Sequence, residues 1–373
     1  MRILIINFEY PPIGGGASPV CEQIASYLYQ RGHSISVVTM AYGNLPAFEE
    51  RNGIFIFRIE SGRRQPNMSR MSEHLKYLYF ARKFLLNHLT EHRYDVTHCH
   101  FFISSGILAR WVWHRFKIPY IVTPHGSDLP GYNPDHFKLM HVFTPPVIRK
   151  IIANCQYIVS PSHFLKDLVT PFIRKNHNKL QVIPNGIVMP DHHEKEKKKI
   201  ILSTGRLLRR KGFHTLVSAV KNQDLHYELH IAGDGPMKKE LEQLATDSKT
   251  RIVFHGWLDN KSTEYKELLE EASIYCLVSK FENAPVSILE AMAHGCAIIT
   301  SDGTGCAEMV GDSGIQVPAE DPLTLKIAIN NLINDENSIG KLGKKAMKRV
   351  NEKFTWERIS EEYEEILIRA CQE

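Results

Sequence analysis

The sequence predicts an α/β protein built from two doubly wound, Rossmann-like domains. Short apolar runs typical of strands alternate with longer stretches of helical periodicity along the chain. This alternation breaks once, at the charged run 191–199, and then starts again. A chain of 373 residues is also long for one core and comfortable for two. Strands that alternate with helices favour parallel sheets covered on both faces.

The predicted elements follow this rhythm in order. In the first domain, 1–190, helices are expected near 17–30, 71–91, 105–116 and 138–153, between strands at 2–6, 34–39, 54–59, 95–99, 119–123, 157–160 and 180–183. The second domain, 191–354, should hold strands at 199–204, 227–232, 251–256, 274–279 and 296–300, each followed by a helix. Residues 355–373 are expected to form a closing helix that crosses back to the first domain, an expectation that rests on the family resemblance described below. In such sheets ligands bind beyond the carboxyl ends of the strands, so two facing domains place a site in the cleft between them.

Composition limits the class of protein. The apolar content of 43% and charged content of 23% are ordinary for a globular protein. The sequence has no run of about 18 apolar residues and no signal-peptide pattern, so neither a membrane span nor secretion is expected. Seven scattered cysteines without a C-x-x-C pair are typical of reduced thiols in a cytoplasmic protein.

Charge is divided unevenly along the chain. Residues 1–190 hold 21 Lys and Arg against 11 Asp and Glu, whereas 191–373 hold 25 against 30. The basic half indicates an anionic partner, such as a lipid-linked phosphate, an acidic glycan or the inner surface of a membrane. Segment 63–93, rich in basic and aromatic residues, is the candidate membrane contact, although an ordinary packed helix explains it equally well. No nucleic-acid-binding module is recognisable, so nucleic acid is not expected.

Two glutamates, Glu282 and Glu290, stand eight residues apart in the segment FENAPVSILEAMA. Glu282 follows the strand near 274–278, and Glu290 lies inside a predicted helix whose first turn suits Pro285. Free N–H groups at a helix start favour a phosphate or a set of hydroxyls, which places Asn283, Ala284 and Val286 beside the ligand. The alternative is a surface helix with two solvated glutamates.

Cations and glycines supply a second set of candidates. Arg206 and Lys211 lie in one loop-to-helix turn and together suit a diphosphate, although both could be solvated. Gly15 and Gly16 follow the first strand and permit close backbone approach to a ligand, or form only a flexible turn. Gly233 follows the strand at 227–232, and Trp257 and Leu258 follow the strand at 251–256, so these edges are expected to flank a nucleoside.

Histidines mark strand ends in the first domain. His125 ends the strand 119–123 and is followed by Asp128. His98 and His100 are two residues apart on a strand end, so their side chains point the same way. Cys99 between them suggests a metal, but no further ligands stand nearby, and a structural or acceptor-side role is preferred. No metal and no cofactor are predicted.

These blocks together resemble the retaining glycosyltransferases of family 4. The E-x7-E segment runs ENAPVSILEAMA, with Asn283 where the family commonly has Gly, and NFEYPPIGGGAS, VTPHGSDL, VIPNGI, STGRLLRRKGF and IAGDGP match in order. The resemblance implies two domains around a cleft (the GT-B fold), a nucleoside diphosphate sugar donor, and metal-independent transfer to a glycan or lipid-linked acceptor. It implies that Arg206 and Lys211 bind the diphosphate, Glu282 the sugar, Glu290 the ribose, and His125 the reacting centre.

The predicted function is therefore transfer of a hexose or N-acetylhexosamine from a UDP- or GDP-sugar to an acceptor hydroxyl. Bacterial-type polysaccharide or glycolipid assembly is the expected setting. A nucleotide-sugar epimerase of similar architecture and a non-catalytic glycan-binding scaffold are the two alternatives. Incubation with the donor alone distinguishes an epimerase from a transferase, because an epimerase makes a new sugar nucleotide without an acceptor.

Overall fold

The chain divides into two units in the computed structural model, which describes residues 1–132, 138–175, 177–191 and 195–372, with the backbone alone for 138–142. Unit 1 comprises Met1–Asn185 and Trp356–Glu373, and unit 2 comprises Gly186–Thr355. The chain thus leaves unit 1 once and returns to it for its last helix. Part of the predicted linker, residues 192–194, and the final residue lie outside the described residues.

Unit 1 is built on a sheet with the strand order β3-β4-β2-β1-β5-β6-β7-β8. All neighbouring pairs are parallel except β3 and β4, which pair antiparallel. The order reverses at β1, so the carboxyl ends of β1 and β5 flank a topological switch point. The strands are β1 (Arg2–Ile6), β2 (Ser34–Tyr42), β3 (Phe48–Arg51), β4 (Ile54–Arg63), β5 (Val96–His100), β6 (Tyr120–Thr123), β7 (Tyr157–Ser160) and β8 (Leu180–Val182).

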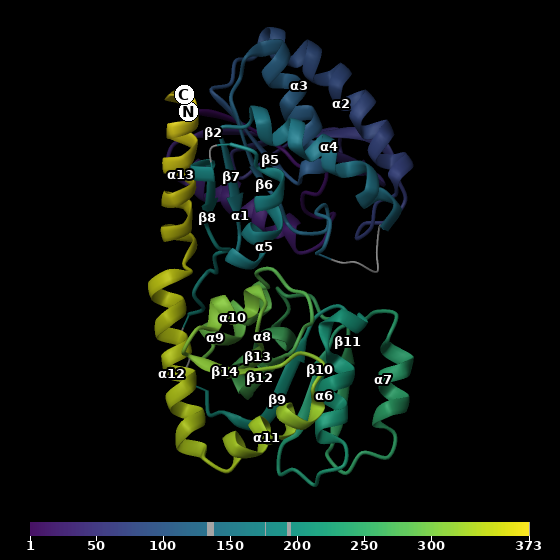
Figure 1. Ribbon diagram of the computed structural model, residues 1–373, viewed down its shortest axis with the longest axis vertical. Helices are drawn as coiled ribbons and strands as arrows, with labels where there is room; N and C mark the ends of the chain where they lie inside the picture. The colour runs from purple at the N-terminus through teal and green to yellow at the C-terminus, as the bar shows by residue number, and fades with distance from the viewer. Residues whose placement is uncertain (133–137, 176, 192–194, 373) are drawn as a thin grey trace. The chain divides into compact units, whose positions relative to one another are not determined.

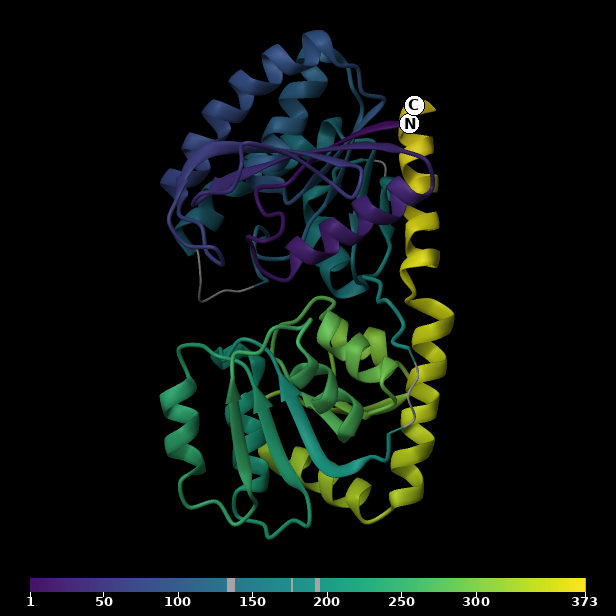
Figure 2. The ribbon, with the colours of Figure 1, turned by 180° about the vertical axis from the view of Figure 1, so that it is seen from behind.

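Helices cover both faces of this sheet. Apolar side chains of α2, α3 and α4 join Leu4 and Ile6 in one core cluster, whereas α1 and α13 lie side by side on the other face (Figures 1 and 2). Both termini lie at the same end of α13 in the two views. The helices are α1 (Ala17–Gln30), α2 (Met71–Glu91), α3 (Ile107–Phe116), α4 (Lys138–Asn154), α5 (His163–Val169) and α13 (Trp356–Gln372).

Unit 2 contains a wholly parallel sheet with the order β11-β10-β9-β12-β13-β14. Adjacent residues such as Ile201 and Leu202 enter different core clusters, because successive side chains of a strand point to opposite faces. The strands are β9 (Lys198–Thr204), β10 (Glu228–Ala232), β11 (Ile252–Gly256), β12 (Ala272–Leu277), β13 (Ala297–Ser301) and β14 (Gly314–Val317).

One face of the unit 2 sheet packs against α8, α9, α10 and α12, and the other against α6, α7 and α11. Side-chain caps fix several helix starts: Asp321 accepts hydrogen bonds from the N–H groups of Leu323 and Thr324 at the start of α11. The helices are α6 (Phe213–Val220), α7 (Lys238–Ala245), α8 (Thr263–Glu271), α9 (Val286–Ala293), α10 (Gly305–Val310), α11 (Pro322–Ile333) and α12 (Glu336–Lys353).

The prediction of two parallel-sheet α/β domains is confirmed, and four local expectations were incomplete. Strands β3 and β14 were not predicted. Strand β9 begins at Lys198, inside the predicted linker, because Lys198 pairs with Ala272 of β12. Helix α9 begins at Val286, so Pro285 occupies the capping position before it rather than its first turn.

Candidate functional site

The loops that follow β9 and β12 in unit 2 bring together the two charged motifs of the sequence. Lys211 ends a single 3-10 turn after β9, and its amine forms an ion pair with a carboxylate oxygen of Glu282, in the loop after β12. The exposed fractions of the two side chains are only 14% and 10%. A buried charge is stable only beside an opposite charge or a charged ligand. The Lys211–Glu282 pair is therefore the electrostatic centre of the candidate site.

The loop that carries Glu282 is held by backbone contacts. The N–H of Gly305 donates to the carbonyl of Glu282 at 3.0 Å, and a Cβ at Gly305 would lie 1.3 Å from the carbonyl oxygen of Asn283. Only glycine fits at position 305, because any side chain would displace the Glu282–Asn283 backbone. On the other side, Arg210 donates to the carbonyl of Phe281 at 3.1 Å.

Glu290 lies one turn into α9 and is half-buried. The hydroxyl of Tyr265, on α8, donates to Oε2 of Glu290 at 2.6 Å. Burial raises the pKa of Glu290, and the hydrogen bond from Tyr265 opposes that rise. The alternative of a surface helix with two solvated glutamates is therefore wrong, since Glu282 is buried as well.

The remaining unit 2 candidates lie at the carboxyl ends of β9, β10 and β11. Arg206 is exposed in the loop after β9, and Gly233 follows β10 with a φ of +154°. A Cβ on Gly233 would lie 1.9 Å from the carbonyl oxygen of Gly205, so the two loops touch through backbone alone. After β11, Trp257 is 71% exposed, whereas Leu258 packs against the core. An exposed indole at a strand end offers a face on which a planar ring can stack.

The glycine loop of unit 1 is organised by Glu9, a residue that no sequence pattern singled out. The carboxylate of Glu9 accepts a hydrogen bond from the N–H of Gly15 at 3.0 Å and pairs with Arg63 at 3.5 Å. Burial raises the pKa of Glu9, and the Gly15 N–H and Arg63 oppose that rise. A Cβ at Gly15 or Gly16 would meet nothing within 4 Å, so packing does not demand glycine at either position.

Three histidines, two of them buried and His125 half-buried, meet at the carboxyl ends of β5 and β6. Nδ1 of His100 and Nε2 of His125 are hydrogen-bonded at 2.9 Å, and the two rings are stacked with centroids 5.2 Å apart. His98 bonds to the hydroxyl of Thr123 at 2.9 Å and packs against the ring of Tyr363 from α13. Burial lowers the pKa of His98 and of His125 to about 3, so both rings are neutral near pH 7.

These histidines form a layer behind the surface, with His98 and His100 fully buried. Asp128 lies beside them and accepts from the N–H of Phe102 at 2.5 Å, and burial raises its pKa to about 6. A role for His98, His100 and Asp128 in acceptor contact stays a prediction. Within the described residues, no group of three or more His, Cys, Asp or Glu side chains is arranged to hold a metal ion.

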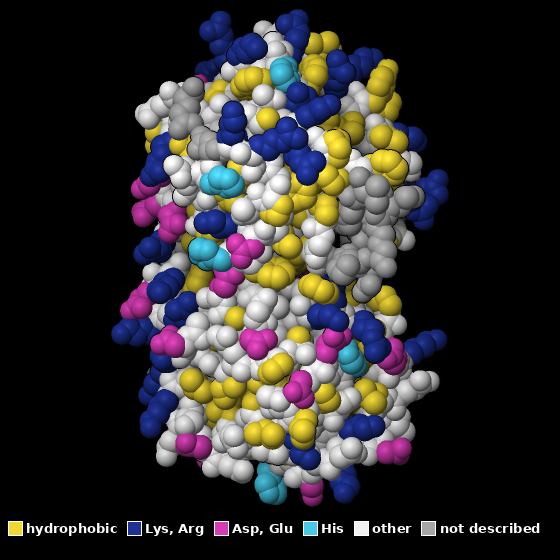
Figure 3. Space-filling model, viewed as in Figure 1, with side chains coloured by type: hydrophobic (Ala, Val, Ile, Leu, Met, Phe, Trp, Pro, Cys, Tyr) yellow, Lys and Arg dark blue, Asp and Glu magenta, His cyan; other side chains and the backbone are white. Residues whose placement is uncertain are grey.

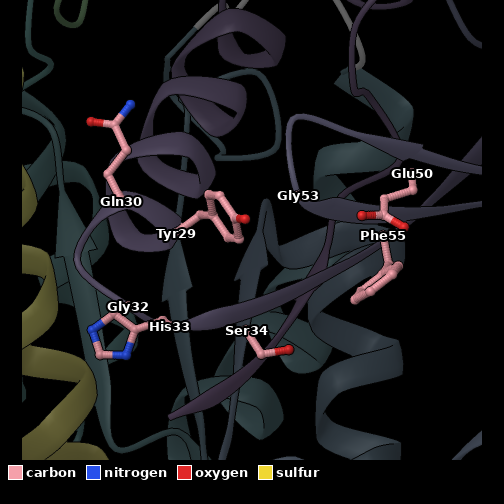
Figure 4. A pocket seen from close by; sticks show the side chains of 8 residues that line it. All are labelled: Tyr29, Gln30, Gly32, His33, Ser34, Glu50, Gly53 and Phe55. Carbon is pink, nitrogen blue, oxygen red and sulfur yellow. The ribbon is translucent and has the colours of Figure 1, made fainter.

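One pocket of unit 1 lies away from the candidate residues of that unit. It has a volume of about 490 Å³ and lies where α1 ends and β2 begins, opposite the β3–β4 turn (Figure 4). Tyr29, Glu50 and Phe55 are among its lining residues. Because it lies at the amino ends of the parallel strands, it is at the edge of the unit 1 sheet opposite the edge that carries Gly15 and His125.

The basic segment 63–93 is only partly available at the surface. Arg63 is buried and donates to the carbonyls of Phe8, Gln65 and Pro66, and the ring of Tyr77 is fully buried. The expectation that Arg63 contacts a membrane is therefore wrong. Among the described residues, no helix combines the length and apolar character needed to cross a membrane.

Two family models match the chain, one in each half. Residues 14–189 match glycosyltransferase family 4, and residues 187–349 match the glycosyl transferases group 1. Together they span both units and include the loops around Gly15, His125, Lys211 and Glu282. A fold of two parallel-sheet α/β domains with a buried Lys–Glu pair thus belongs to a glycosyltransferase enzyme. The chain is a member of the family 4 and group 1 glycosyltransferases, which have the GT-B fold and use nucleotide sugars.

Individual relatives agree with this assignment. The chain is 28% identical over 395 residues to an uncharacterized glycosyltransferase of Methanocaldococcus jannaschii, covering 97% of this chain and 96% of the relative. It is 29% identical over 172 residues to the lipopolysaccharide core biosynthesis glycosyltransferase LpsE of Rhizobium meliloti, covering 45% and 49%. The structure of HepE from Anabaena, solved with UDP and glucose, superposes with a TM-score of 0.75 at 18% identity and covers 99% and 100%.

Proposed function

We propose that the protein transfers a hexose or N-acetylhexosamine, with retention of anomeric configuration, from a UDP- or GDP-sugar to a hydroxyl of a glycan or lipid-linked acceptor. The proposed setting is polysaccharide or glycolipid assembly, the process named for the lipopolysaccharide relative. The observation that carries the proposal is the buried Lys211–Glu282 pair beside the start of α9. A cation and a carboxylate held together there match the two chemistries of a sugar diphosphate, an anion and a set of hydroxyls.

In this proposal donor binding exchanges the partners of both charges. The amine of Lys211 turns from Glu282 to the diphosphate, joined by Arg206 and by N–H groups at the start of α9. Glu282 then accepts hydrogen bonds from sugar hydroxyls, and Glu290 accepts from the ribose. Trp257 and Leu258 border the base, and the backbone around Asn283, Ala284 and Gly233 approaches the donor closely.

In the proposed reaction the protein mainly orients the reactants and stabilises charge. As the bond from the anomeric carbon to the phosphate oxygen breaks, negative charge grows on the diphosphate, and the departing oxygen accepts the proton of the incoming hydroxyl on the same face. Lys211 and Arg206 stabilise that charge. His125, neutral and oriented by His100, is assigned to the transferred sugar near the reacting centre, with Gly15 and Gly16 leaving space for it.

Lys211→Ala tests the diphosphate role. Loss of one such contact should remove about 2–4 kcal/mol of transition-state stabilisation, which lowers kcat/KM by roughly 30- to 800-fold. The matched control is Arg209→Ala, because Arg209 lies in the same turn but is 69% exposed and paired with Glu240. Thermal unfolding must accompany the kinetics, since the variant leaves Glu282 without its partner. A folded Lys211→Ala enzyme as active as the Arg209→Ala control would refute the assignment.

Calorimetry distinguishes the proposed roles of Glu282 and Glu290. We expect Glu290→Ala to weaken binding of the free nucleoside diphosphate, because the ribose hydroxyls lose their acceptor. Glu282→Ala should not weaken that binding and should mainly impair use of the sugar nucleotide. UDP and GDP are first ranked by thermal shift to choose the ligand. Equal binding of the chosen diphosphate by Glu290→Ala and the parent would rule out the ribose role.

The alternatives give different outcomes in one incubation. An epimerase would produce a new sugar nucleotide from donor alone, and a binding scaffold would turn over no sugar nucleotide with any acceptor. The proposed transferase should release nucleoside diphosphate in step with glycosylated acceptor.

A further inference from the structure

A second, smaller pocket in unit 1 carries a charge pattern that the transfer chemistry does not use. It has a volume of about 120 Å³ and lies between the end of β4 and the start of α2. On the scale of about 30 Å³ per liquid water it holds about four waters, enough for a phosphate group. Its lining residues are Ser61, Gly62, Arg64, Arg70, Ser72, Glu73 and Lys76.

Three of these residues are exposed cations without a counter-ion. Within the described residues, no hydrogen bond or ion pair is made by the guanidinium of Arg64, that of Arg70 or the amine of Lys76. The Lys76 amine lies against the backbone of Gly62, 3.4 Å from where a Cβ on that glycine would stand. Like charges repel, so three unpaired cations around one small pocket are stabilised when an anion enters it.

Among the described residues that line the pocket, the one carboxylate, Glu73, already accepts hydrogen bonds. Glu73 is buried and accepts hydrogen bonds from the N–H groups of Arg64 at 3.2 Å and Arg70 at 2.8 Å. Its charge therefore fixes the loop that presents the two arginines. The lining retains a formal charge of +2, and the pocket lies at the amino end of a 21-residue helix, where the helix dipole also favours an anion.

A buried hydroxyl independently indicates a ligand. Ser61 is fully buried, lines the pocket, and its Oγ has no hydrogen-bond partner among the described residues. Leaving a buried polar atom unpaired is unfavourable, so a hydroxyl without a partner inside the protein is expected to meet one outside it, such as a ligand or water. A phosphate oxygen in the pocket would accept a hydrogen bond from this hydroxyl.

An apolar stripe runs along α2 directly from the pocket. Met71, Leu75 and Tyr79 follow one another at four-residue spacing on the exposed side of the helix, and they are 49%, 60% and 68% exposed. A soluble anion would gain nothing from these side chains. A lipid whose phosphate occupies the pocket would place its apolar part against them. Figure 3 shows hydrophobic and basic side chains side by side over the helices of unit 1.

We propose that this pocket binds the terminal phosphate headgroup of an anionic membrane lipid, while the exposed apolar side chains of α2 enter the lipid surface. This goes beyond the proposed transfer reaction and concerns unit 1 alone. The pocket lies at the carboxyl edge of the unit 1 sheet, the edge that also carries Gly15 and His125. A phosphate-bearing lipid held there would bring an acceptor, or the membrane that contains it, to that edge.

Co-sedimentation of the full-length protein with vesicles tests the proposal. The probes are phosphatidylcholine vesicles with and without phosphatidic acid, and inorganic phosphate followed by thermal shift. Lys76→Gln is compared with Lys83→Gln, because Lys83 is also exposed and lies seven residues on, on the same side of α2, but outside the pocket. An exposed lysine near an anionic membrane is worth about fivefold in affinity. We expect Lys83→Gln to lose no more than that and Lys76→Gln to lose about tenfold or more.

A second pair of variants tests the lipid part. Leu75→Ser should weaken vesicle binding while leaving protection by inorganic phosphate unchanged. Leu323→Ser, at a similarly exposed leucine of unit 2, should change neither. Equal losses from Lys76→Gln and Lys83→Gln would overturn the proposal in favour of diffuse surface attraction. Unchanged vesicle binding by Leu75→Ser, or equal binding to vesicles without phosphatidic acid, would overturn it as well.

Failure of this proposal can be told apart from failure of the proposed transfer function. Lys211→Ala should bind phosphatidic acid vesicles as the parent does, because Lys211 belongs to unit 2. Lys76→Gln should bind the nucleoside diphosphate as the parent does.

Discussion

Gly305 offers a test of the donor site that alters no residue assigned to bind the donor. It is the first residue of α10, and its missing side chain lets the Asn283 carbonyl approach. In Gly305→Ala the new Cβ would stand 1.3 Å from that oxygen, whereas real Cβ contacts are not closer than 3.0 Å. The Glu282–Asn283 backbone, or α10, must therefore move by at least about 1.7 Å.

The expected effect on activity is large and that on stability moderate. A misplacement of about 1 Å in a positioned catalytic group can cost about 100-fold in rate, so we expect kcat/KM to fall at least that far. Overpacking of this kind should lower the free energy of unfolding by about 1–3 kcal/mol. Binding of the nucleoside diphosphate should weaken, because the start of α9 moves with the loop.

The matched control is Gly303→Ala, two residues earlier. Gly303 has a φ of +61°, and a Cβ there would meet nothing within 4 Å. This substitution strains the backbone by about 1–2 kcal/mol without pushing on the loop. Urea unfolding, calorimetry and steady-state kinetics on both variants then separate lost stability from displaced geometry. If Gly305→Ala keeps kcat/KM within about threefold of Gly303→Ala, the position of the Glu282–Asn283 segment does not govern transfer.

Two further predictions concern buried ionisable groups. Tyr265→Phe should weaken nucleoside diphosphate binding by about 1.5–3 kcal/mol. The reason is that Glu290 loses the 2.6 Å hydrogen bond from Tyr265, which positions its carboxylate and opposes the rise of its pKa. An unchanged affinity in calorimetry would contradict this prediction. His98 has a pKa of about 3 in the folded protein and an ordinary value near 6.5 when unfolded, so below pH 6.5 the unfolded chain binds a proton that the folded one does not. Stability therefore falls as the pH falls, and from pH 7.5 to 5.0 His98 alone should cost about 2 kcal/mol. His98→Gln should remove that share of the loss in urea titrations at the two pH values; parallel pH dependence in variant and parent would show that His98 does not titrate as stated.

Most elements could be predicted from hydrophobic periodicity, and the misses have identifiable causes. Strand β3 reads Phe-Glu-Glu-Arg, which has too many charges for a strand pattern. A signal was nevertheless present: Asn52 and Gly53 both have positive φ, as the Asn-Gly turn of a two-residue hairpin requires. Strand β14 is a short edge strand of four residues that include a glycine and a glutamine, so its apolar pattern is weak.

The candidate site was predictable in its residue types and not in its pairings. Lys211 and Glu282 are 71 residues apart and meet because β9 and β12 are neighbours in the sheet, an order that periodicity does not determine. The same holds for His100 and His125, which meet because β5 pairs with β6. Glu9 escaped selection because a single acidic residue before a glycine turn has no distinctive pattern.

The pairings also change how donor affinity should be understood. Lys211 is engaged by Glu282 before any ligand arrives, so its contact with a donor replaces an existing one. The binding free energy of the donor is then the difference between the charged contacts it makes and those it replaces in a partly buried site. Folding has already removed water from these charges, so donor binding does not bear that desolvation cost again. A nucleoside diphosphate without its sugar reaches Lys211 but gives Glu282 no hydroxyls in return, and so leaves a buried carboxylate unpaired. It follows that the intact sugar nucleotide should bind more tightly than the diphosphate alone, and that this preference should vanish in Glu282→Gln, whose neutral amide needs no counter-ion.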